Sequence, residues 1–307
     1  MECQLLRGKV IDLILETNGI IKKYGNKIVL NNINMKIKRG DIYGFIGKNG
    51  AGKTTFMRVV LSLTRPTNGE VYFFGDKKIE DVGLKVGSLI ESPGLDFSLS
   101  AYENLKRFSI IYGADDENIY ELLKLVGLSN AKDKKVKNFS LGMKQRLGIA
   151  VALLGNPEFV LLDEPINGLD PEGIKEIRDM ILKLNKEKNI TFLISSHLLD
   201  ELSKVVTRYG IINNGVLIEE IDAKELEDKC KNKVVFECDN QKKAIDIIKK
   251  TVPEEDIEIK KDKIEITSHL KEASKINKDL VKGGILVNAF YPNKDSLEEY
   301  FMKRIGG

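Results

Sequence analysis

The chain has 307 residues, of which 42% are hydrophobic and 31% charged, as in soluble globular proteins with room for one large domain and a smaller one. The formal net charge of +3 is small and basic residues alternate with acidic ones, which excludes the concentrated positive charge of a nucleic-acid-binding surface, so we expect no nucleic-acid partner. The three cysteines (Cys3, Cys230, Cys238) lack metal-ligand spacing, exclude a disulfide framework and indicate a cytoplasmic protein. The sequence has no apolar run long enough to span a membrane, so we expect a partner to supply any membrane span.

Residues 1–12 form a leader or extension to which we assign no function, and the first strand signal begins at Leu13. Short β-rich runs then alternate with turns up to residue 74, notably at residues 28–37 and 70–74, which predicts an antiparallel sheet. A turn at residues 22–25 precedes these strands. The ring of Tyr24 in this turn could stack on adenine, although a half-buried strand tyrosine fits the sequence at least as well.

Residues 47–55 read GKNGAGKTT and match the phosphate-binding pattern G-x-x-x-x-G-K-[ST]. A buried strand is predicted before the loop at residues 41–46 and a helix after it at residues 54–61. Glycines let the backbone amides approach phosphate oxygens, and the helix start adds unpaired N–H groups, whereas a mere glycine-rich turn would not require the whole motif. Lys53 would contact the β- and γ-phosphates, and the Thr54 hydroxyl would coordinate Mg²⁺. The predicted nucleotide-binding residues of this loop are Gly47, Lys48, Asn49, Gly50, Ala51, Gly52, Lys53, Thr54 and Thr55.

A further buried strand is predicted at residues 86–90, and Pro93 and Gly94 then break the chain before a helical region. Apolar residues recur at three- and four-residue intervals in three predicted helices, at residues 101–111, 118–126 and 141–154. Ser140 stands at the N-cap position of the last helix, whose free amides could face an anion. Taken alone, this feature is only a capped helix.

Residues 159–165, FVLLDEP, predict an apolar strand that ends in two acids. Asp163 lies at the carboxyl end of the strand, where ligands gather in an open α/β sheet, and could hold Mg²⁺ through water. Glu164 could orient and polarise an attacking water, although two acids at a strand end could also belong to an ordinary loop. A third apolar strand, at residues 191–197, brings His197 to the same edge, where a lone histidine is more often structural.

Five segments taken together and in this order resemble the ATP-binding subunit of an ABC transporter over about residues 13–221: GKNGAGKTT, FSLGMKQR, FVLLDEP, GLD at 168–170 and SSH at 195–197. The resemblance implies an α/β fold: a P-loop NTPase core of the ABC type at residues 13–222. This ATPase core would carry an antiparallel β subdomain and an α-helical subdomain, the latter at about residues 100–155. It also implies ATP and Mg²⁺ as cofactors and a head-to-tail homodimer that encloses two ATP molecules.

The resemblance further implies roles for individual residues. Ser140 and Gly142 would contact the γ-phosphate bound by the opposite subunit, and Asp170 would communicate between the subunits. Glu164 would be the catalytic base and His197 would sense the γ-phosphate. For the adenine base, the resemblance favours stacking on the tyrosine at position 24.

Two departures narrow the resemblance. The usual L-S-G-G-Q signature is FSLGM at residues 139–143, and Glu91 replaces the usual glutamine after the strand near residue 90. This combination resembles the bacitracin and lantibiotic self-protection branch, whose ATPases pair with separately encoded membrane permeases. Glu91 offers an oxygen ligand to Mg²⁺ but adds negative charge beside Asp163 and Glu164.

Residues 223–307 predict a small α+β accessory domain with the order β-α-β-β-α-β, compatible with a ferredoxin-like module. The predicted strands are residues 234–238, 257–259, 264–267 and 285–289, and the predicted helices are residues 244–250, 270–281 and, closing the chain, 296–304. No chemical motif occurs there, and His269 fits an ordinary surface residue. We expect this domain to stabilise a dimer or to regulate the ATPase.

The function predicted from these features is ATP hydrolysis coupled to export of an amphipathic peptide antibiotic, by a subunit bound through its permease to the cytoplasmic face of the cell membrane. The alternative is a soluble ABC ATPase that acts on ribosomes or DNA. Such proteins commonly carry two cassettes or long coiled coils, and this sequence has one phosphate loop and no sustained heptads. A generic P-loop kinase would not explain FSLGMKQR or Asp170.

Overall fold

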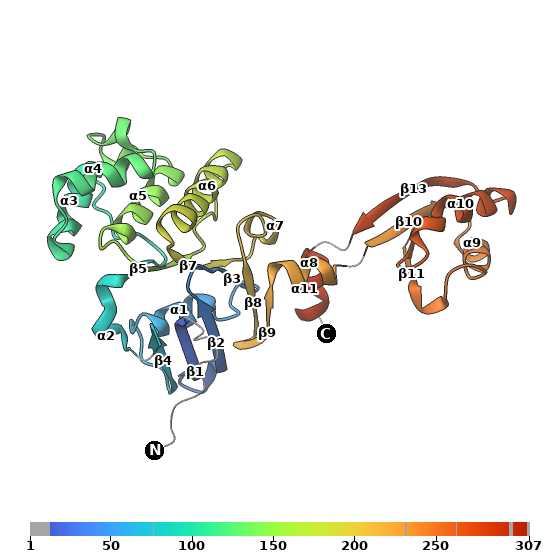
Figure 1. Ribbon diagram of the computed structural model, residues 1–307, viewed down its shortest axis with the longest axis horizontal. Coiled ribbons are helices and arrows are strands. Elements are labelled where there is room, and N and C mark those ends of the chain that lie inside the picture. The colour runs from blue at the N-terminus through green and yellow to red at the C-terminus, as the bar shows by residue number, and fades with distance from the viewer. Residues whose placement is uncertain (1–12, 76, 231, 262, 295–296, 306–307) are drawn as a thin grey trace, which may run out of the picture. The chain divides into compact units, whose positions relative to one another are not determined.

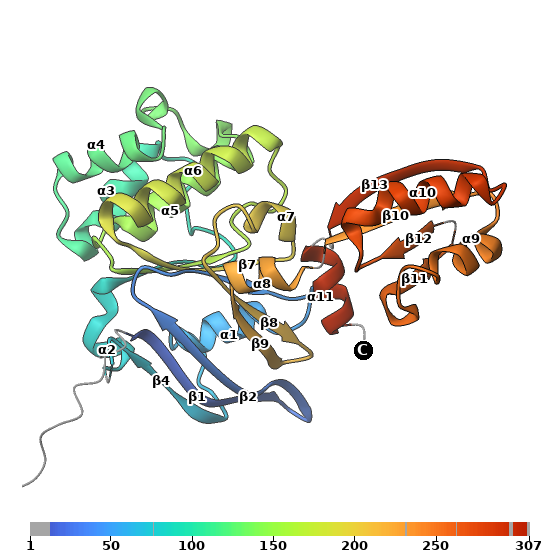
Figure 2. The same ribbon diagram turned by 45° about the vertical axis from the view of Figure 1, so that its right-hand side comes forward.

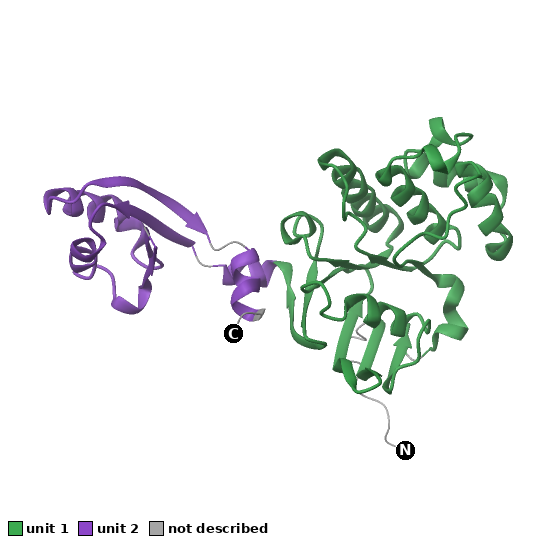
Figure 3. Cartoon of the chain, turned by 180° about the vertical axis from the view of Figure 1, so that it is seen from behind, with its two compact units in different colours: residues 1–223 green, residues 224–307 purple. Residues whose placement is uncertain are grey.

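The computed structural model describes residues 13–75, 77–230, 232–261, 263–294 and 297–305. The N-terminal extension at residues 1–12, the thiol of Cys3 and the first residue of the predicted closing helix lie outside these ranges. The chain divides into two compact units, Met1–Ala223 and Lys224–Gly307 (Figure 3). Within the described ranges, no helix combines the length and the apolar character that crossing a membrane requires.

A six-stranded mixed sheet forms the centre of the first unit. Its order is β5-β6-β7-β3-β8-β9, in which the first five strands run parallel and β9 pairs with β8 in the antiparallel sense. The strands are β5 (Val86–Leu89), β6 (Phe159–Asp163), β7 (Thr191–Ser196), β3 (Ile42–Ile46), β8 (Arg208–Asn213) and β9 (Val216–Asp222). Every residue of β3, β6 and β7 is buried, which explains their continuous apolar sequences.

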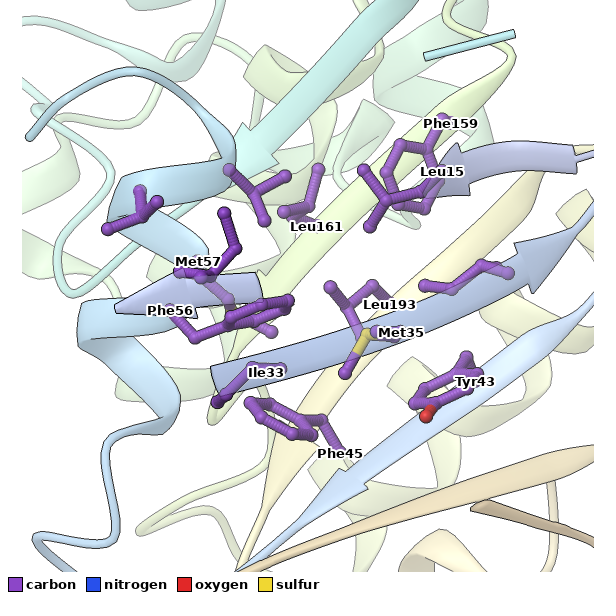
Figure 4. Packing of buried hydrophobic residues seen from close by; sticks show 14 of the residues in the cluster. Leu15, Ile33, Met35, Tyr43, Phe45, Phe56, Met57, Phe159, Leu161 and Leu193 are labelled. Atoms are coloured by element: carbon purple, nitrogen blue, oxygen red, sulfur yellow. The ribbon is translucent and has the colours of Figure 1, made fainter. Parts of the chain in front are cut away.

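A smaller antiparallel sheet has the order β2-β1-β4, from β1 (Leu13–Tyr24), β2 (Lys27–Lys38) and β4 (Asn68–Phe73). Helix α1 (Lys53–Val60) lies between the two sheets, where Phe56 packs 5.1 Å from the ring of Phe45 (Figure 4). The turn predicted at residues 22–25 is wrong for residues 22–24, because β1 continues through Tyr24, which lies opposite Lys27 of β2. The turn itself starts at Gly25, whose φ of 56° suits glycine.

The helical region follows the predicted pattern, with α3 (Ala101–Tyr112), α4 (Asp116–Leu125) and α5 (Leu141–Leu153). Figures 1 and 2 show these helices and α6 (Pro171–Lys188) on the side of the mixed sheet opposite the smaller sheet. Side chains cap each start: Ser100, Asp115, Ser140 and Asp170 accept a backbone N–H three residues on. The sequence reasoning made no prediction for α6, β8 or β9, nor for the short helices α2 (Ile79–Val82), α7 (Leu199–Leu202) and α8 (Ala223–Lys229).

The second unit is built on a four-stranded antiparallel sheet with the order β11-β12-β10-β13. Its elements are β10 (Asn232–Cys238), α9 (Gln241–Ile248), β11 (Ile257–Lys260), β12 (Lys263–Ile266), α10 (Ala273–Lys282), β13 (Val287–Lys294) and α11 (Leu297–Ile305). The last strand starts two residues later than predicted, because the backbone first turns at Gly284 (φ 78°) and Asp239 accepts the N–H of Leu286.

Short 3₁₀ turns complete the fold at Gly83–Lys85, Ser129–Ala131, Val136–Asn138, Glu254–Asp256 and Leu270–Glu272. In the second unit, Phe236, Ile264 and Leu280 belong to one apolar core shared by the sheet and helices α9 and α10. Lys233 is also buried, and its Nζ lies 2.9 Å from a carboxylate oxygen of Glu265. A buried lysine is tolerated here because an opposite charge neutralises it.

Candidate nucleotide-binding site

The phosphate loop connects the central strand β3 to α1. Its backbone needs glycine at three points: Gly50 and Gly52 have φ values of 81° and 112°, and a Cβ on Gly47 would lie 2.6 Å from the carbonyl oxygen of Ile212. Gly52 is also the N-cap of α1 and has no side chain to accept the first N–H groups of the helix. The start of α1 therefore leaves amides available to an anion. Lys48, Asn49 and Gly50 are exposed at the tip of the loop.

Lys53 is buried and reaches back across the loop. Its Nζ donates to the carbonyl oxygen of Gly47 at 2.7 Å and lies 3.2 Å from Oε1 of Glu164. The side chain is only 6% exposed, so the ammonium group faces into the loop. The predicted phosphate lysine and the predicted base are thus ion-paired.

Thr54 and Asp163 meet although they lie far apart in the sequence. The Thr54 hydroxyl donates to Oδ2 of Asp163 at 2.7 Å, because α1 follows β3 and Asp163 ends β6, which lies two strands away in the same sheet. Asp163 is itself buried. The partly buried hydroxyl of Thr54 and the buried carboxylate at this spacing offer two oxygen ligands of the kind that Mg²⁺ prefers.

Ser195 contacts both acids at the end of β6, Asp163 and Glu164, a contact that the sequence did not predict. Its hydroxyl donates to Oδ1 of Asp163 at 2.5 Å and accepts the backbone N–H of Glu164 at 2.9 Å. Ser195 is fully buried on β7, directly opposite Asp163 in the parallel register. Its place just before His197 in the SSH segment was the available signal, but that signal did not identify the partner atoms.

The carboxylate of Glu164 has a different partner on each oxygen. One oxygen faces Lys53, and the other lies 2.9 Å from Nδ1 of His197, which follows β7. Glu164 adopts a φ of 48°, in the left-handed region that residues with a Cβ rarely occupy. The two adjacent acids therefore have different partners, since the carboxylate of Asp163 accepts from Thr54 and Ser195 instead.

Glu91 contacts neither of these acids through a hydrogen bond. Its Oε2 accepts from Nη2 of Arg58 at 2.8 Å, and its side chain is 57% exposed. Within the described ranges, no three His, Cys, Asp or Glu residues are grouped closely enough to hold a metal ion. Glu91, Asp163 and Glu164 therefore do not form a three-carboxylate cluster in this structure.

Ser140 and Asp170 cap neighbouring helices at a separate exposed place. Ser140 Oγ accepts the N–H of Met143 at 3.2 Å, and Asp170 Oδ1 accepts that of Gly173 at 3.0 Å. A Cβ added to Gly142 would meet only the side chain of Leu169, at 3.8 Å. Among the described residues, no hydrogen bond or ion pair joins these caps to the phosphate loop.

Tyr24 presents one accessible aromatic ring near the end of β1. The side chain is 49% exposed, and Nζ of Lys22 lies 4.8 Å from the centre of the ring. The structure joins Tyr24 to no other predicted nucleotide-binding residue by a hydrogen bond. A base stacked on this ring would meet the lysine or displace it.

Comparison with protein families supports the interpretation of this site. The model of the family described as "ABC transporter" matches residues 30–167, and one described as "AAA domain, putative AbiEii toxin, Type IV TA system" matches residues 133–203. The bacitracin transport ATP-binding protein BcrA of Bacillus licheniformis is 44% identical over 96% of this chain and 98% of its own length. The lantibiotic transport ATP-binding protein SrtF of Streptococcus pyogenes is 43% identical over 73% of this chain and 99% of its own length.

Solved structures are similar over about two thirds of the chain. The ATP-binding cassette MJ1267 in its ADP conformation has a TM-score of 0.63 at 28% identity, covering 69% of this chain and 92% of that one. The dimeric, post-hydrolysis cassette MJ0796 bound to ADP and Pi has a TM-score of 0.61 at 26% identity, covering 68% and 99%. The predicted fold and family are confirmed. The chain belongs to the ABC transporter family, as one of its nucleotide-binding ATPase subunits.

Proposed function

We propose that this chain hydrolyses ATP to drive export of a peptide antibiotic through a separate membrane permease, which holds it at the cytoplasmic face of the membrane. The names of its relatives support the cargo class, since BcrA is a bacitracin transport protein and SrtF a lantibiotic transport protein. The observation that carries the catalytic part is the position of Glu164 between Lys53 and His197.

The residues of the phosphate loop fit Mg²⁺ and ATP. The loop amides and Lys53 would hold the phosphates, and the Thr54 hydroxyl with the Asp163 carboxylate, 2.7 Å apart, would hold Mg²⁺. Bound Mg²⁺ would supply positive charge against the β- and γ-phosphate oxygens. Lys48, Asn49, Ala51 and Thr55 would complete the loop around the phosphates, and Tyr24 would stack on adenine.

The ion pair of Lys53 with Glu164 suggests how nucleotide prepares the site. The ammonium group of Lys53 would move from Glu164 to the phosphates when nucleotide binds, because phosphate oxygens carry more negative charge than one carboxylate. Glu164 would then be free to accept a proton from the attacking water. His197, 2.9 Å from Glu164, would keep the carboxylate oriented and reach the γ-phosphate.

A homodimer would complete each site. Ser140 and Gly142, at the exposed start of α5, would contact the γ-phosphate held by the opposite subunit, and Asp170 would lie at the subunit boundary. The dimeric form of the MJ0796 cassette supports this arrangement. We propose that residues 223–307 form the accessory domain that stabilises the dimer or regulates it, separate from the ATPase domain at 13–222.

Glu164→Gln tests the catalytic part of the proposal. The amide keeps the size of the side chain but cannot accept a proton, so ATP turnover should fall about 10²–10⁴-fold while Mg-ATP still binds. The variant should accumulate as a dimer on size exclusion with Mg-ATP, whereas wild type returns to monomer. Glu187→Gln, on the exposed side of α6, is the control and should turn over normally. Normal turnover by Glu164→Gln would show that the base lies elsewhere.

Affinity capture from membranes tests the transport part. The full-length protein, cross-linked in its native cells, should recover a permease with many membrane spans. Recovery with ribosomes or DNA instead would contradict transport and favour a soluble ABC ATPase.

A further inference from the structure

An ion pair joins Arg58, on α1, to Glu91, which follows β5. Nη2 of Arg58 donates to Oε2 of Glu91 at 2.8 Å, and the two side chains are 43% and 57% exposed. Glu91 follows β5 and has a φ of 60°, a left-handed conformation that residues with a Cβ rarely adopt. The glutamate therefore has one specific cationic partner rather than a place among the other acids.

The fold places this ion pair next to the proposed cation position. Thr54 and Arg58 are four residues apart on α1, so both side chains lie on the same face of the helix, about one turn apart. Strands β5 and β6 pair in parallel with Leu89 opposite Leu162, so Glu91 and Asp163 leave the sheet at the same edge. The carboxylate of Glu91 thus has two possible partners at that edge, the guanidinium group and a cation beside Thr54.

The two acids near Asp163 each have a basic partner of their own. Lys53 faces Glu164, and Arg58 faces Glu91. The hydrogen bonds recorded for the Asp163 carboxylate come instead from two neutral hydroxyl groups. Asp163 therefore stays available to a cation, and each neighbouring acid is matched to its own basic side chain. A glutamine at position 91 could not form such an ion pair, so the partnership depends on the acid in this chain.

We propose that Arg58 is a positioning residue that competes with the magnesium ion for the carboxylate of Glu91. With Arg58 in place, Glu91 is held by a side chain that starts one helical turn along α1 from Thr54. When the guanidinium group is removed, Glu91 becomes available as an additional oxygen ligand at the cation position. This inference rests on the Mg-ATP site proposed above.

The test measures metal binding rather than turnover. Full-length protein loaded with ADP is titrated with Mn²⁺, and free Mn²⁺ is followed by electron paramagnetic resonance. Arg58→Met should bind Mn²⁺ about two- to fivefold more tightly than wild type, the range expected for an exposed ion pair that no longer competes. In the Glu91→Gln background the same substitution should have no effect. Arg58→Lys should keep most of the wild-type affinity, because it keeps the charge.

A matched control separates this competition from a general loss of positive charge. Lys78 pairs with Glu70 at 3.6 Å, with exposures of 45% and 61%, close to those of the Arg58 pair. Lys78→Met should leave Mn²⁺ affinity unchanged. Equal tightening by Arg58→Met with and without Glu91, no tightening, or equal tightening by Lys78→Met would each overturn the role of Arg58. Failure of wild type to bind Mn²⁺ with ADP would instead overturn the proposed site itself.

Discussion

Removing the Ser195 hydroxyl should measure how much the hydrogen bonds from β7 to the two acids at the end of β6 stabilise the fold. Ser195→Ala deletes an oxygen that donates to the Asp163 carboxylate and accepts from the N–H of Glu164. Ser195 has no exposed surface, so water does not reach the position that the oxygen leaves. A buried carboxylate oxygen and a backbone N–H both lose a partner.

The expected cost follows from these two bonds. A hydrogen bond to a charged group is worth about 1.5–3 kcal/mol, and a donor left without a partner adds a further penalty of about 1 kcal/mol or more. We expect a loss of about 2.5–4 kcal/mol in the free energy of unfolding of the first unit. For a unit of this size, 1 kcal/mol lowers Tm by about 2–4 °C, so Tm should fall by about 5–15 °C.

Thermal unfolding followed by circular dichroism of the nucleotide-free protein measures this loss. The two units can unfold separately, so the transition to compare is the one that moves to higher temperature when Mg-ADP is added. Ser196→Ala is the matched control. Its hydroxyl, equally buried, accepts only the neutral N–H of Leu198, at 2.9 Å, and its loss should cost about half as much or less. If Ser195→Ala melts no lower than Ser196→Ala, the assigned bonds do not stabilise the site.

Two other predictions concern residues away from the site. Gly210→Ala should lower Tm by about 4–12 °C, because the new Cβ would lie 2.1 Å from the hydroxyl oxygen of the buried Tyr43. Gly83→Ala is the control and should change Tm little, because the position has open space around it. Equal Tm values for the two variants would contradict the clash. Hydrogen bonds from Lys85 and Arg39 lower the pKa of Glu158. The charged carboxylate therefore stabilises the folded state at pH values above the ordinary pKa of glutamate, and this stabilisation is lost as the pH falls through the lowered pKa. Urea unfolding should therefore show Glu158→Gln about 0.5–1 kcal/mol less stable at pH 7, with a difference that shrinks as pH falls below the ordinary glutamate range, whereas a difference that stays constant into the acid range would contradict the pairing.

Local patterns were enough to predict the elements that carry the site. Neighbours in the sequence define three of these features: the phosphate loop, the two acids at the end of β6 and the Ser140 cap. The structure has a strand or helix where each was expected. The α6 signals were equally local, since Asp170 caps the helix and Pro171 starts it, but they were not interpreted. The error at Tyr24 came from a lysine-rich strand end that has no apolar alternation.

The pairs within the site could not be predicted in this way. Thr54 and Asp163 lie 109 positions apart, and Arg58 and Glu91 lie 33 apart. No spacing rule connects residues of α1 with residues at the ends of β5 and β6, because the order of the strands depends on the whole fold. The role of Ser195 followed only from the register that sets it opposite Asp163.

The position of β3 has a consequence for synthesis of the chain. All five residues of this strand are buried, and its partners β7 and β8 begin at Thr191 and Arg208. At translation rates of about 5–20 residues per second, β3 leaves the ribosome roughly 7–30 s before either partner does. The antiparallel sheet, complete by Phe73, can form early and cover only one side of β3. During that interval an apolar strand with unpaired edges is exposed to other chains, so slower elongation should increase aggregation of the nascent protein.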